Sequence, residues 1–375
     1  MMLEPAKFLS ALRDQNVNFF CGVPDSLLKD FCACVTSTLS ADKHMIAANE
    51  GAAVGLAIGR HIACDDIPLV YMQNSGLGNA INPLISLASN DIYGVPMLVM
   101  IGWRGEPGKK DEPQHVHQGR VMYAMIEAME FASVILSDDL EAAIAQIKNA
   151  AQLTKETASP VFIIIQKGTF ESFSMDGAKS ELLLTREQAI IEIVKNAPKD
   201  AVFVSTTGMP SRELFEYRAR SEFGHAQDFL TVGGMGHASQ IALGLALNKP
   251  EKAVICLDGD GAALMRLGSL AISGQKRPGN LTPIILNNGA HASVGGQPIV
   301  GLEISFTKIA DGCGYKQIKS VRSTGEIAEA MNSFEPRVGS GMLEIQVLPG
   351  NRTDIGRPTT TPRENILALK EFVHG

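Results

Sequence analysis

The sequence lacks the features that mark a membrane, secreted or nucleic-acid-binding protein. No apolar run among its 375 residues reaches the roughly 18 needed to cross a bilayer, and charges interrupt the N-terminal stretch where a signal peptide would be apolar. Acidic residues outnumber basic ones by 40 to 33, whereas a surface that follows nucleic-acid phosphates is basic. We therefore expect a cytoplasmic protein whose partners include neither a membrane nor a nucleic acid.

Cysteine is also scarce, with six residues scattered along the chain. No pair has C-x-x-C spacing, so neither a zinc site nor a disulfide framework is indicated. We expect these cysteines to be reduced and to lie in the core. They are Cys21, Cys32, Cys34, Cys64, Cys256 and Cys313.

What the sequence does contain is a series of short, continuous apolar runs, which are typical of parallel strands buried on both faces. Helix-like stretches, including 140–156 and 185–197, lie between them. Strands that alternate with helices indicate a doubly wound α/β fold. The expected strands are 67–73, 95–103, 160–166, 201–207, 252–260, 282–288 and 341–348.

A break in this alternation falls near residues 167–184, where glycine, serine and charged residues are typical of a linker. The length of the chain suits two α/β domains better than one core. We therefore predict a first domain over 1–170, a linker over 171–184 and a second domain over 185–375, each with its own parallel sheet.

The stretch VICLDGDGAALMRLGSLA (254–271) predicts a buried strand, a Gly-Asp-Gly turn and a helix. Ligands of open α/β sheets bind beyond the carboxyl ends of strands, where glycines let the backbone approach a phosphate. Asp260 would repel a phosphate there unless a divalent cation bridged the two, and Mg²⁺ is commonly held in this way. The next expected strand ends in Asn287 and Asn288, which are further oxygen donors. The alternative is a surface turn followed by a helix cap.

The Gly-Asp-Gly turn, followed after residues 262–286 by Asn-Asn, resembles the fingerprint of thiamine-diphosphate enzymes. The resemblance implies that Mg²⁺ is bound by Asp260, the side-chain oxygen of Asn288 and the backbone carbonyl of Ala290. It also implies that the cofactor diphosphate lies across Gly259–Gly261.

The stretch FLTVGGMGHASQIALGLAL (229–247) resembles another cofactor-binding segment of these enzymes. By that resemblance Met235 holds the cofactor in its bent shape, and the carbonyl of Gly233 accepts a hydrogen bond from the cofactor's amino group. The alternatives are a core methionine and a dinucleotide-binding loop. The second lacks the acidic residue expected after such a loop.

Glu50, in ANEGAAVGLAIGRHIA (48–63), is expected to open a helix. Its position resembles that of the catalytic glutamate, which exchanges a proton with the cofactor's aminopyrimidine ring. The segment 73–84 resembles the loop that follows in the family. The alternative role for Glu50 is a charge favoured by the helix dipole. Because Glu50 and Asp260 lie in different domains, the resemblance implies a homodimer or higher homo-oligomer with active sites at subunit interfaces.

The two-domain length, without room for a third domain, resembles the phosphonopyruvate decarboxylase family and its relative, the sulfopyruvate decarboxylases. The resemblance covers nearly the whole chain, and it implies conversion of a small 2-oxo acid, phosphonopyruvate, to phosphonoacetaldehyde and CO₂ in phosphonate biosynthesis. Sulfopyruvate decarboxylases are commonly split into two subunits, so a fused chain favours phosphonopyruvate. The stretches that carry the resemblance include 19–32, 104–120, 205–214, 287–298 and 354–365.

Several polar residues are candidates for contact with the substrate. Asp25 and Ser26, in the GVPDS stretch, resemble substrate-side positions of related decarboxylases. His115 and His117 are expected in a polar loop, and with His291 they suit proton transfer near neutral pH. A phosphonate also needs cationic hydrogen-bond donors. The alternative role for each basic candidate is that of a solvated charge on the protein surface. The basic candidates are Arg104, Lys109, Lys110, Arg120 and Arg357.

One position departs from the family pattern. Ala292 stands in NGAHAS where these decarboxylases usually have an aspartate. This departure leaves the identity of the substrate open, but it does not affect the expected metal ligands. Two other reactions stay possible, namely decarboxylation of sulfopyruvate and decarboxylation with a second aldehyde as acceptor. A non-catalytic cofactor-binding subunit is a third alternative, but retention of Glu50, Asp260 and Asn288 argues against it.

Overall fold

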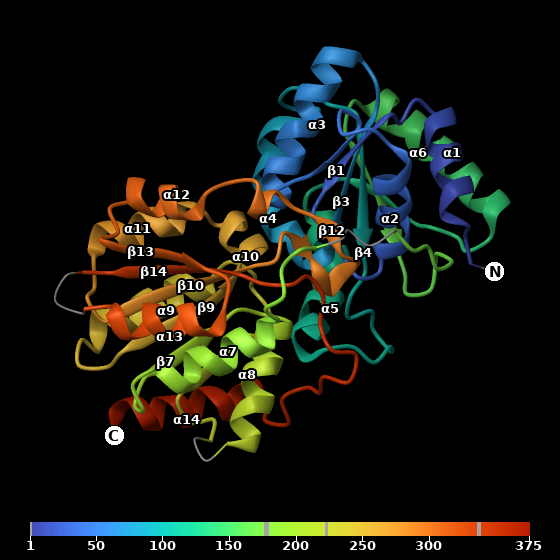
Figure 1. The fold of residues 1–375 in the computed structure, drawn as a ribbon. Coiled ribbons are helices and arrows are strands. Elements are labelled where there is room, and N and C mark those ends of the chain that lie inside the picture. The colour runs from blue at the N-terminus through green and yellow to red at the C-terminus, as the bar shows by residue number, and fades with distance from the viewer. Residues whose placement is uncertain (1, 176–179, 222–223, 336–338) are drawn as a thin grey trace. The chain divides into compact units, whose positions relative to one another are not determined.

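The computed structural model describes residues 2–175, 180–221, 224–335 and 339–375. The chain divides into two compact units, Met1–Gly177 and Ala178–Gly375, here called the first and second unit. Each contains a six-stranded parallel sheet with helices on both faces (Figure 1), which confirms the doubly wound architecture without a middle domain. The linker boundaries at 170 and 185 stay predictions, and residues 176–179 of that linker lie outside the described residues.

The sheet of the first unit has the strand order β2-β1-β3-β4-β6-β5. The strand order reverses between β1 and β3: the chain places β2 on one side of β1, and β3 and β4 on the other. All of these strands are parallel, so the carboxyl ends of β1, β3 and β4 are neighbours at one edge. This is where open α/β sheets bind ligands. The strands are β1 (Phe19–Gly22), β2 (His44–Ile46), β3 (Pro68–Gln73), β4 (Met97–Gly102), β5 (Ala132–Ile135) and β6 (Pro160–Ile165).

Helices cover both faces of this sheet because neighbouring strand residues point to opposite faces. Leu69 and Tyr71 of β3 pack with α1, α2 and α6, whereas Val70 and Met72 pack with α3, α4 and α5 (Figure 1). The helices are α1 (Pro5–Asp14), α2 (Lys29–Thr38), α3 (Glu50–Cys64), α4 (Leu77–Pro83), α5 (Pro113–Ala128) and α6 (Leu140–Thr157), with the turns η1 (Asn74–Gly76) and η2 (Leu84–Ala88) beside α4.

The sheet of the second unit has the order β13-β14-β10-β9-β7-β8. Here β9 lies between β7 and β10, so the ends of these three strands are neighbours. The strands are β7 (Val202–Ser205), β8 (Asp228–Leu230), β9 (Val254–Gly259), β10 (Leu281–Asn287), β13 (Gln317–Val321) and β14 (Gly341–Gln346), and a separate antiparallel pair is formed by β11 (Ala290–His291) and β12 (Gln297–Pro298).

The helices of the second unit also cover two faces. Ile255 and Leu257 of β9 pack with α7 and α13, and Val254 and Cys256 pack with α9 and α14. The helices are α7 (Arg186–Asn196), α8 (Met209–Arg220), α9 (Ala238–Asn248), α10 (Asp260–Met265), α11 (Gly268–Lys276), α12 (Phe306–Gly312), α13 (Thr324–Ser333) and α14 (Pro362–His374), with the short turns η3 (Ala292–Val294) and η4 (Val300–Leu302).

Each of the seven expected strands forms, as do the two expected helices, but other details of the prediction were wrong. The segment 73–84 is η1 and α4 rather than a loop, and the helix after the Gly-Asp-Gly turn ends at Met265 before α11 begins. Cys64 is exposed and Cys313 is half-buried, whereas the other four cysteines are buried, and none of the six forms a disulfide. Among the described residues, no helix is both long and apolar enough to span a membrane.

Candidate active site

Asp260 and Asn288 lie together at the carboxyl edge of the second sheet, because β9 and β10 pair along their length. Oδ2 of Asp260 accepts hydrogen bonds from the backbone N–H of Asn288 at 3.1 Å and of Gly289 at 2.7 Å, and Oδ1 accepts one from Gly261 at 2.9 Å. Gly289 has φ of +66°, a conformation that glycine adopts at no steric cost. This turn brings the loop after β10 onto the aspartate.

The electrostatics of this edge favour a cation. Burial raises the pKa of Asp260 to about 6, although four backbone hydrogen bonds counteract it. Burial likewise raises the pKa of the nearby Asp258 to about 6. Two buried carboxylates at one strand end need positive charge to stay ionised together.

The oxygen atoms at this edge fit Mg²⁺, which takes hard oxygen ligands and usually few protein groups. Among the described residues, no three His, Cys, Asp or Glu side chains are grouped to hold a metal, but the expected set of one carboxylate, one amide and one carbonyl is of a different kind. Oδ1 of Asn288 accepts from the backbone N–H of Ala290 at 3.1 Å. Asn287 instead donates to the Gly301 carbonyl at 2.7 Å and to Glu344 at 2.8 Å, so its amide anchors the loop.

The backbone of this edge leaves room for a diphosphate. A Cβ added at Gly259 would meet no atom within 4 Å, so the turn is open on that side. A Cβ at Gly261 would instead lie 3.0 Å from the His291 ring and 3.3 Å from Cε of Met235. The structure thus brings Gly261, His291 and Met235 together, with Gly233 half-buried in the segment before α9. Burial lowers the pKa of His291 to about 4, which keeps its imidazole neutral.

A second group of candidates lies at the carboxyl edge of the first sheet. Asp25 follows β1, Asn74 follows β3 and Arg104 follows β4. The Asp25 side chain is fully buried, and its Oδ2 accepts from the Leu27 N–H at 2.8 Å, whereas its Oδ1 has no hydrogen-bond partner among the described residues. Burial raises the pKa of this carboxyl, against the opposing effect of the Leu27 N–H and of the Arg104 charge. A buried carboxyl with a raised pKa is a candidate for proton transfer.

Asp111 binds both Arg104 and His115, and Arg104 in turn binds Ser26. The Arg104 guanidinium donates to both Asp111 oxygens, from Nε at 2.8 Å and from Nη2 at 2.5 Å, and its Nη1 donates to the Ser26 hydroxyl at 2.5 Å. Nδ1 of His115 lies 3.0 Å from Oδ1 of Asp111. Three of the expected substrate-side residues, Ser26, Arg104 and His115, therefore form one connected cluster with Asp111.

Glu50 is the first residue of α3, as expected, and its side chain is buried. Asn49 caps the helix by accepting from the Ala52 N–H at 2.9 Å. Oε2 of Glu50 accepts from the Asn79 amide at 2.7 Å, and a Cβ at Gly76 would lie 2.4 Å from Oε1. This glutamate is held in one place by a polar partner and by a glycine that leaves space for it.

The remaining candidates are exposed at the surface. His117 is exposed and pairs with Arg120 at 2.8 Å, while Lys109 is exposed and pairs with Glu106. The expectation of a polar loop at 115–117 was wrong, because both histidines lie in α5 and point in different directions: His115 is buried. Lys110 and Arg357 are exposed.

Several residues at these edges were missed from the sequence. Asp111 resembled a loop charge, and only its place four residues before His115 hinted at a contact, since that is one helical turn. Asn74 and Asn79 lie in a segment whose resemblance was noted without roles for single residues. Gln297 is fully buried with neither amide atom hydrogen-bonded, and no sequence signal distinguished it.

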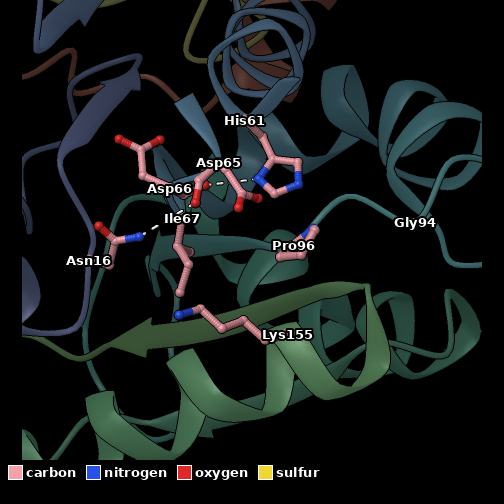
Figure 2. A pocket seen from close by; sticks show the side chains of 8 residues that line it. All are labelled: Asn16, His61, Asp65, Asp66, Ile67, Gly94, Pro96 and Lys155. Atoms are coloured by element: carbon pink, nitrogen blue, oxygen red, sulfur yellow. Dashed lines mark hydrogen bonds between the residues drawn. The ribbon is translucent and has the colours of Figure 1, made fainter. Parts of the chain in front are cut away.

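A surface hollow of about 440 Å³ lies at the opposite, amino-terminal edge of the first sheet (Figure 2). Its lining includes Asn16, His61 and Asp66, where the His61 ring contacts the Asp66 carbonyl at 2.9 Å. Arg60 binds the Asp66 carboxylate from Nε at 3.0 Å and from Nη2 at 2.7 Å. None of the expected site residues lines this hollow.

Comparison with known proteins identifies the class. A model described as "Thiamine pyrophosphate enzyme, N-terminal TPP binding domain" matches residues 6–126, and one for the "C-terminal TPP binding domain" matches residues 206–345. The fold, the strand-end sites and these matches define a thiamine pyrophosphate enzyme. The chain is 32% identical to phosphonopyruvate decarboxylase of Streptomyces viridochromogenes, over 99% of this chain and 95% of that one. It therefore belongs to the phosphonopyruvate decarboxylase family, whose members are carboxy-lyases.

Two further relatives bear on the substrate. Phosphonopyruvate decarboxylase of Streptomyces hygroscopicus is also 32% identical, over 99% of this chain and 94% of that one. Sulfopyruvate decarboxylase of Methanosarcina acetivorans is 26% identical over 97% of this chain and 96% of that one. That relative is itself a single fused chain, since the match covers 96% of it. The expectation that a fused chain favours phosphonopyruvate over sulfopyruvate was therefore wrong.

Proposed function

We propose that this protein is a Mg²⁺- and thiamine-diphosphate-dependent decarboxylase that converts phosphonopyruvate to phosphonoacetaldehyde and CO₂ in phosphonate biosynthesis. The observation that carries the proposal is 32% identity to a phosphonopyruvate decarboxylase over 99% of the chain. The two polar groups at the strand ends supply side chains for the cofactor and for a charged 2-oxo acid.

The residues of the second unit are proposed to hold the cofactor. Asp260, the side chain of Asn288 and the Ala290 carbonyl would bind Mg²⁺, and the diphosphate would lie across Gly259–Gly261, where the backbone is open at Gly259. Met235 and the Gly233 carbonyl would support the rest of the cofactor. When bound, thiamine diphosphate supplies the electron sink that lets a 2-oxo acid lose CO₂.

The acid–base chemistry is proposed for four side chains. Glu50, held by Asn79, would exchange a proton with the cofactor ring. Asp25, whose burial favours the protonated carboxyl, is a candidate proton donor near His115. Neutral His291 is a candidate proton acceptor beside Gly261.

The phosphonate is proposed to meet Arg104 and Ser26. Both lie in the cluster around Asp111, and a fixed guanidinium suits the oxygens of a phosphonate. His117 is a less favoured contact because it is exposed and pairs with Arg120. Arg357, in the second unit, stays a candidate.

We also propose a homodimer or higher homo-oligomer in the cytoplasm, with each active site formed by residues of two chains. Support comes from the placement of Glu50 and Asp260 in different units, and from exposed apolar side chains on α3 and η2, such as Leu56 and Ile85.

Sulfopyruvate is the second candidate substrate, favoured by the full-length similarity to the Methanosarcina enzyme and by Ala292. A sulfonate carries one negative charge, whereas a phosphonate carries up to two. A comparison of the two substrates therefore tests how strongly the site favours a doubly charged group.

The test is an assay of the purified protein with thiamine diphosphate and Mg²⁺ against phosphonopyruvate, sulfopyruvate and pyruvate. CO₂ and aldehyde are both measured, with and without EDTA. We expect the highest kcat/KM with phosphonopyruvate and loss of turnover in EDTA that added Mg²⁺ restores. A higher kcat/KM with sulfopyruvate would reject phosphonopyruvate as the preferred substrate. Full turnover in EDTA would reject the proposed dependence on Mg²⁺. Turnover that requires an added aldehyde would indicate the acceptor reaction.

A further inference from the structure

Asp111 is the centre of the cluster in the first unit, although the proposed chemistry assigns it no role. Its carboxylate accepts five hydrogen bonds. Two come from Arg104, one from His115, and one each from the backbone N–H groups of Gly105 at 2.8 Å and Glu112 at 2.7 Å. A single carboxylate with this many donors is fixed in both position and orientation.

The charge on Asp111 is permanent at physiological pH. Burial raises the pKa of this carboxyl, but the hydrogen bonds from Arg104, His115 and the two backbone groups outweigh burial and hold the pKa well below its usual range. The side chains of Arg104 and Asp111 are only 17% and 15% exposed, so solvent screens the pair incompletely.

The loop that carries Arg104 is also clamped to α5. A Cβ at Gly105 would lie 1.9 Å from the His115 carbonyl, and one at Gly119 would lie 1.8 Å from the Gly105 carbonyl. The Trp103 indole donates to the Gly119 carbonyl at 2.9 Å, and Asn74 donates to the Arg104 carbonyl at 2.7 Å. The backbone is therefore set by these contacts, which leaves the orientation of the Arg104 side chain to Asp111 and Ser26.

The contact with Asp111 also selects the tautomer of His115. An ionised carboxylate only accepts hydrogen bonds, so Nδ1 of His115 carries the proton that it donates to Asp111. The other ring nitrogen, Nε2, is then the one that can accept or release a proton.

We propose that Asp111 is a positioning residue for the decarboxylation, one that fixes Arg104 as the receptor for the anionic group of the substrate and presents His115 with Nε2 as its exchangeable nitrogen. This inference rests on the proposed function, because it takes Arg104 and His115 as substrate-side residues.

The test compares Asp111→Asn with a matched control, Asp66→Asn. Asparagine keeps the shape and one acceptor oxygen but removes the charge, and it no longer fixes the His115 tautomer. Asp66 is buried and also binds an arginine, Arg60, through two nitrogens, but it lies at the opposite edge of the same sheet (Figure 2). Both substitutions thus break the same kind of ion pair in the same unit.

We expect Asp111→Asn to lower kcat/KM for the decarboxylated 2-oxo acid about a hundredfold, the effect typical of a displaced reacting group. Asp66→Asn should stay within about twofold of the wild type once folded protein is quantified. Asp111→Glu, which keeps the charge but moves it, should fall between them. Equal kcat/KM for Asp111→Asn and Asp66→Asn would overturn the inference.

Two readouts do not depend on turnover. Binding of 3-phosphonopropionate, an unreactive analogue that carries both a carboxylate and a phosphonate, is measured by calorimetry on the cofactor-loaded protein, and ¹⁵N NMR of labelled histidine gives the His115 tautomer. We expect weaker binding and a mixture of tautomers only in Asp111→Asn. Unchanged binding together with an unchanged tautomer would reject the role of Asp111. If the wild type prefers sulfopyruvate, phosphonopyruvate is rejected as the substrate. The comparison of Asp111→Asn with Asp66→Asn is then made with sulfopyruvate, and it still decides the role of Asp111.

Discussion

At the residue scale, the contacts of Glu50 support its proposed catalytic role, while its place in the first turn of α3 also suits the helix dipole. Asn49 already caps α3, so the helix does not need Glu50 for that purpose. Burial of the carboxylate beside Gly76, with one hydrogen bond from Asn79, costs free energy, and a functional use of the group would account for that cost. A proton exchange with a bound ring would provide that use.

Glu50→Gln tests this role because glutamine keeps the shape and can still contact Asn79. We expect kcat to fall by about 10²- to 10⁴-fold, as for loss of a general acid–base group, with thiamine diphosphate binding retained in calorimetry. Glu156→Gln, on the exposed side of α6, is the control. Full turnover by Glu50→Gln would remove Glu50 from the mechanism.

Asp228 and Arg218 make a second residue-scale case, this time of stability. Both side chains are almost completely buried, and Nη2 of Arg218 donates to Oδ1 of Asp228 at 3.1 Å. Burial raises the pKa of Asp228 from 3.8 to about 7, and the Arg218 charge counteracts only part of this. The folded state therefore binds a proton that the unfolded chain releases at lower pH. The resulting stabilisation is full below pH 3.8 and is lost as the pH rises to about 7.

Asp228→Asn removes this titration. We expect the free energy of unfolding of the wild type, relative to the variant, to fall between pH 5 and 7 by at most about 1.4 kcal/mol per pH unit. Urea denaturation at several pH values measures it, with exposed Asp311→Asn on α12 as the control. A difference that rises with pH instead would mean that the ion pair, not burial, controls this carboxyl.

What the sequence revealed about single residues depended on local order. Asp260 and Asn288 were predictable because each directly follows an apolar strand, and parallel neighbours place their carboxyl ends together. Asp111 was not, because its five hydrogen bonds come from the loop after β4, from Glu112 just before α5 and from α5 itself, whose relative placement exists only after the sheet forms. His115 and His117 are two residues apart in the sequence, so they lie on different sides of α5. Which of them is buried depends on how α5 packs against the sheet.

At the element scale, burial explains most of the strands that the sequence disclosed, although β1 is buried and was not among them. The expected strands, such as β6, are buried along their length and read as continuous apolar runs. The strands β2, β5, β8 and β13 lie at sheet edges, and β5 is mostly exposed. An edge strand needs fewer apolar residues, so composition alone did not identify it.

The turn η4 gives a prediction for an element. A Cβ at Gly301 would lie 2.7 Å from Oδ2 of Asp260 and 2.8 Å from Oδ1 of Asn287. Gly301→Ala should push η4 and the proposed metal ligand apart, at a cost of about 1–3 kcal/mol for overpacking. We expect the Mg²⁺ concentration for half-maximal activity to rise about tenfold or more.

A Mg²⁺ titration of activity and of thermal stability measures this change. Gly312→Ala in α12 is the matched control, because a Cβ there meets nothing within 4 Å. Identical titrations for the two variants would show that η4 does not constrain the metal site.

At the scale of the whole molecule, large apolar side chains on the first unit stay exposed. Ile62 of α3 is 78% exposed and Tyr93, in the loop after η2, is 72% exposed. Gly55 and Gly59 of α3 leave open space where a side chain would be. Exposed apolar surface of this kind marks interaction sites, and a second copy of the chain is the occupant that the proposed shared active site requires.

Complementation tests that assembly directly. Glu50→Gln and Asp260→Asn each remove one half of the proposed site, so each homo-oligomer should be inactive. The two variants are co-expressed with different affinity tags, and the mixed dimers are purified. If each site takes Glu50 from one chain and Asp260 from the other, one of the two sites is intact and activity recovers to about half that of the wild type. Mixed dimers of Glu50→Gln with the double variant serve as the control, since they contain no intact site. Absence of recovery in the mixed dimers would place both residues of each site in a single chain.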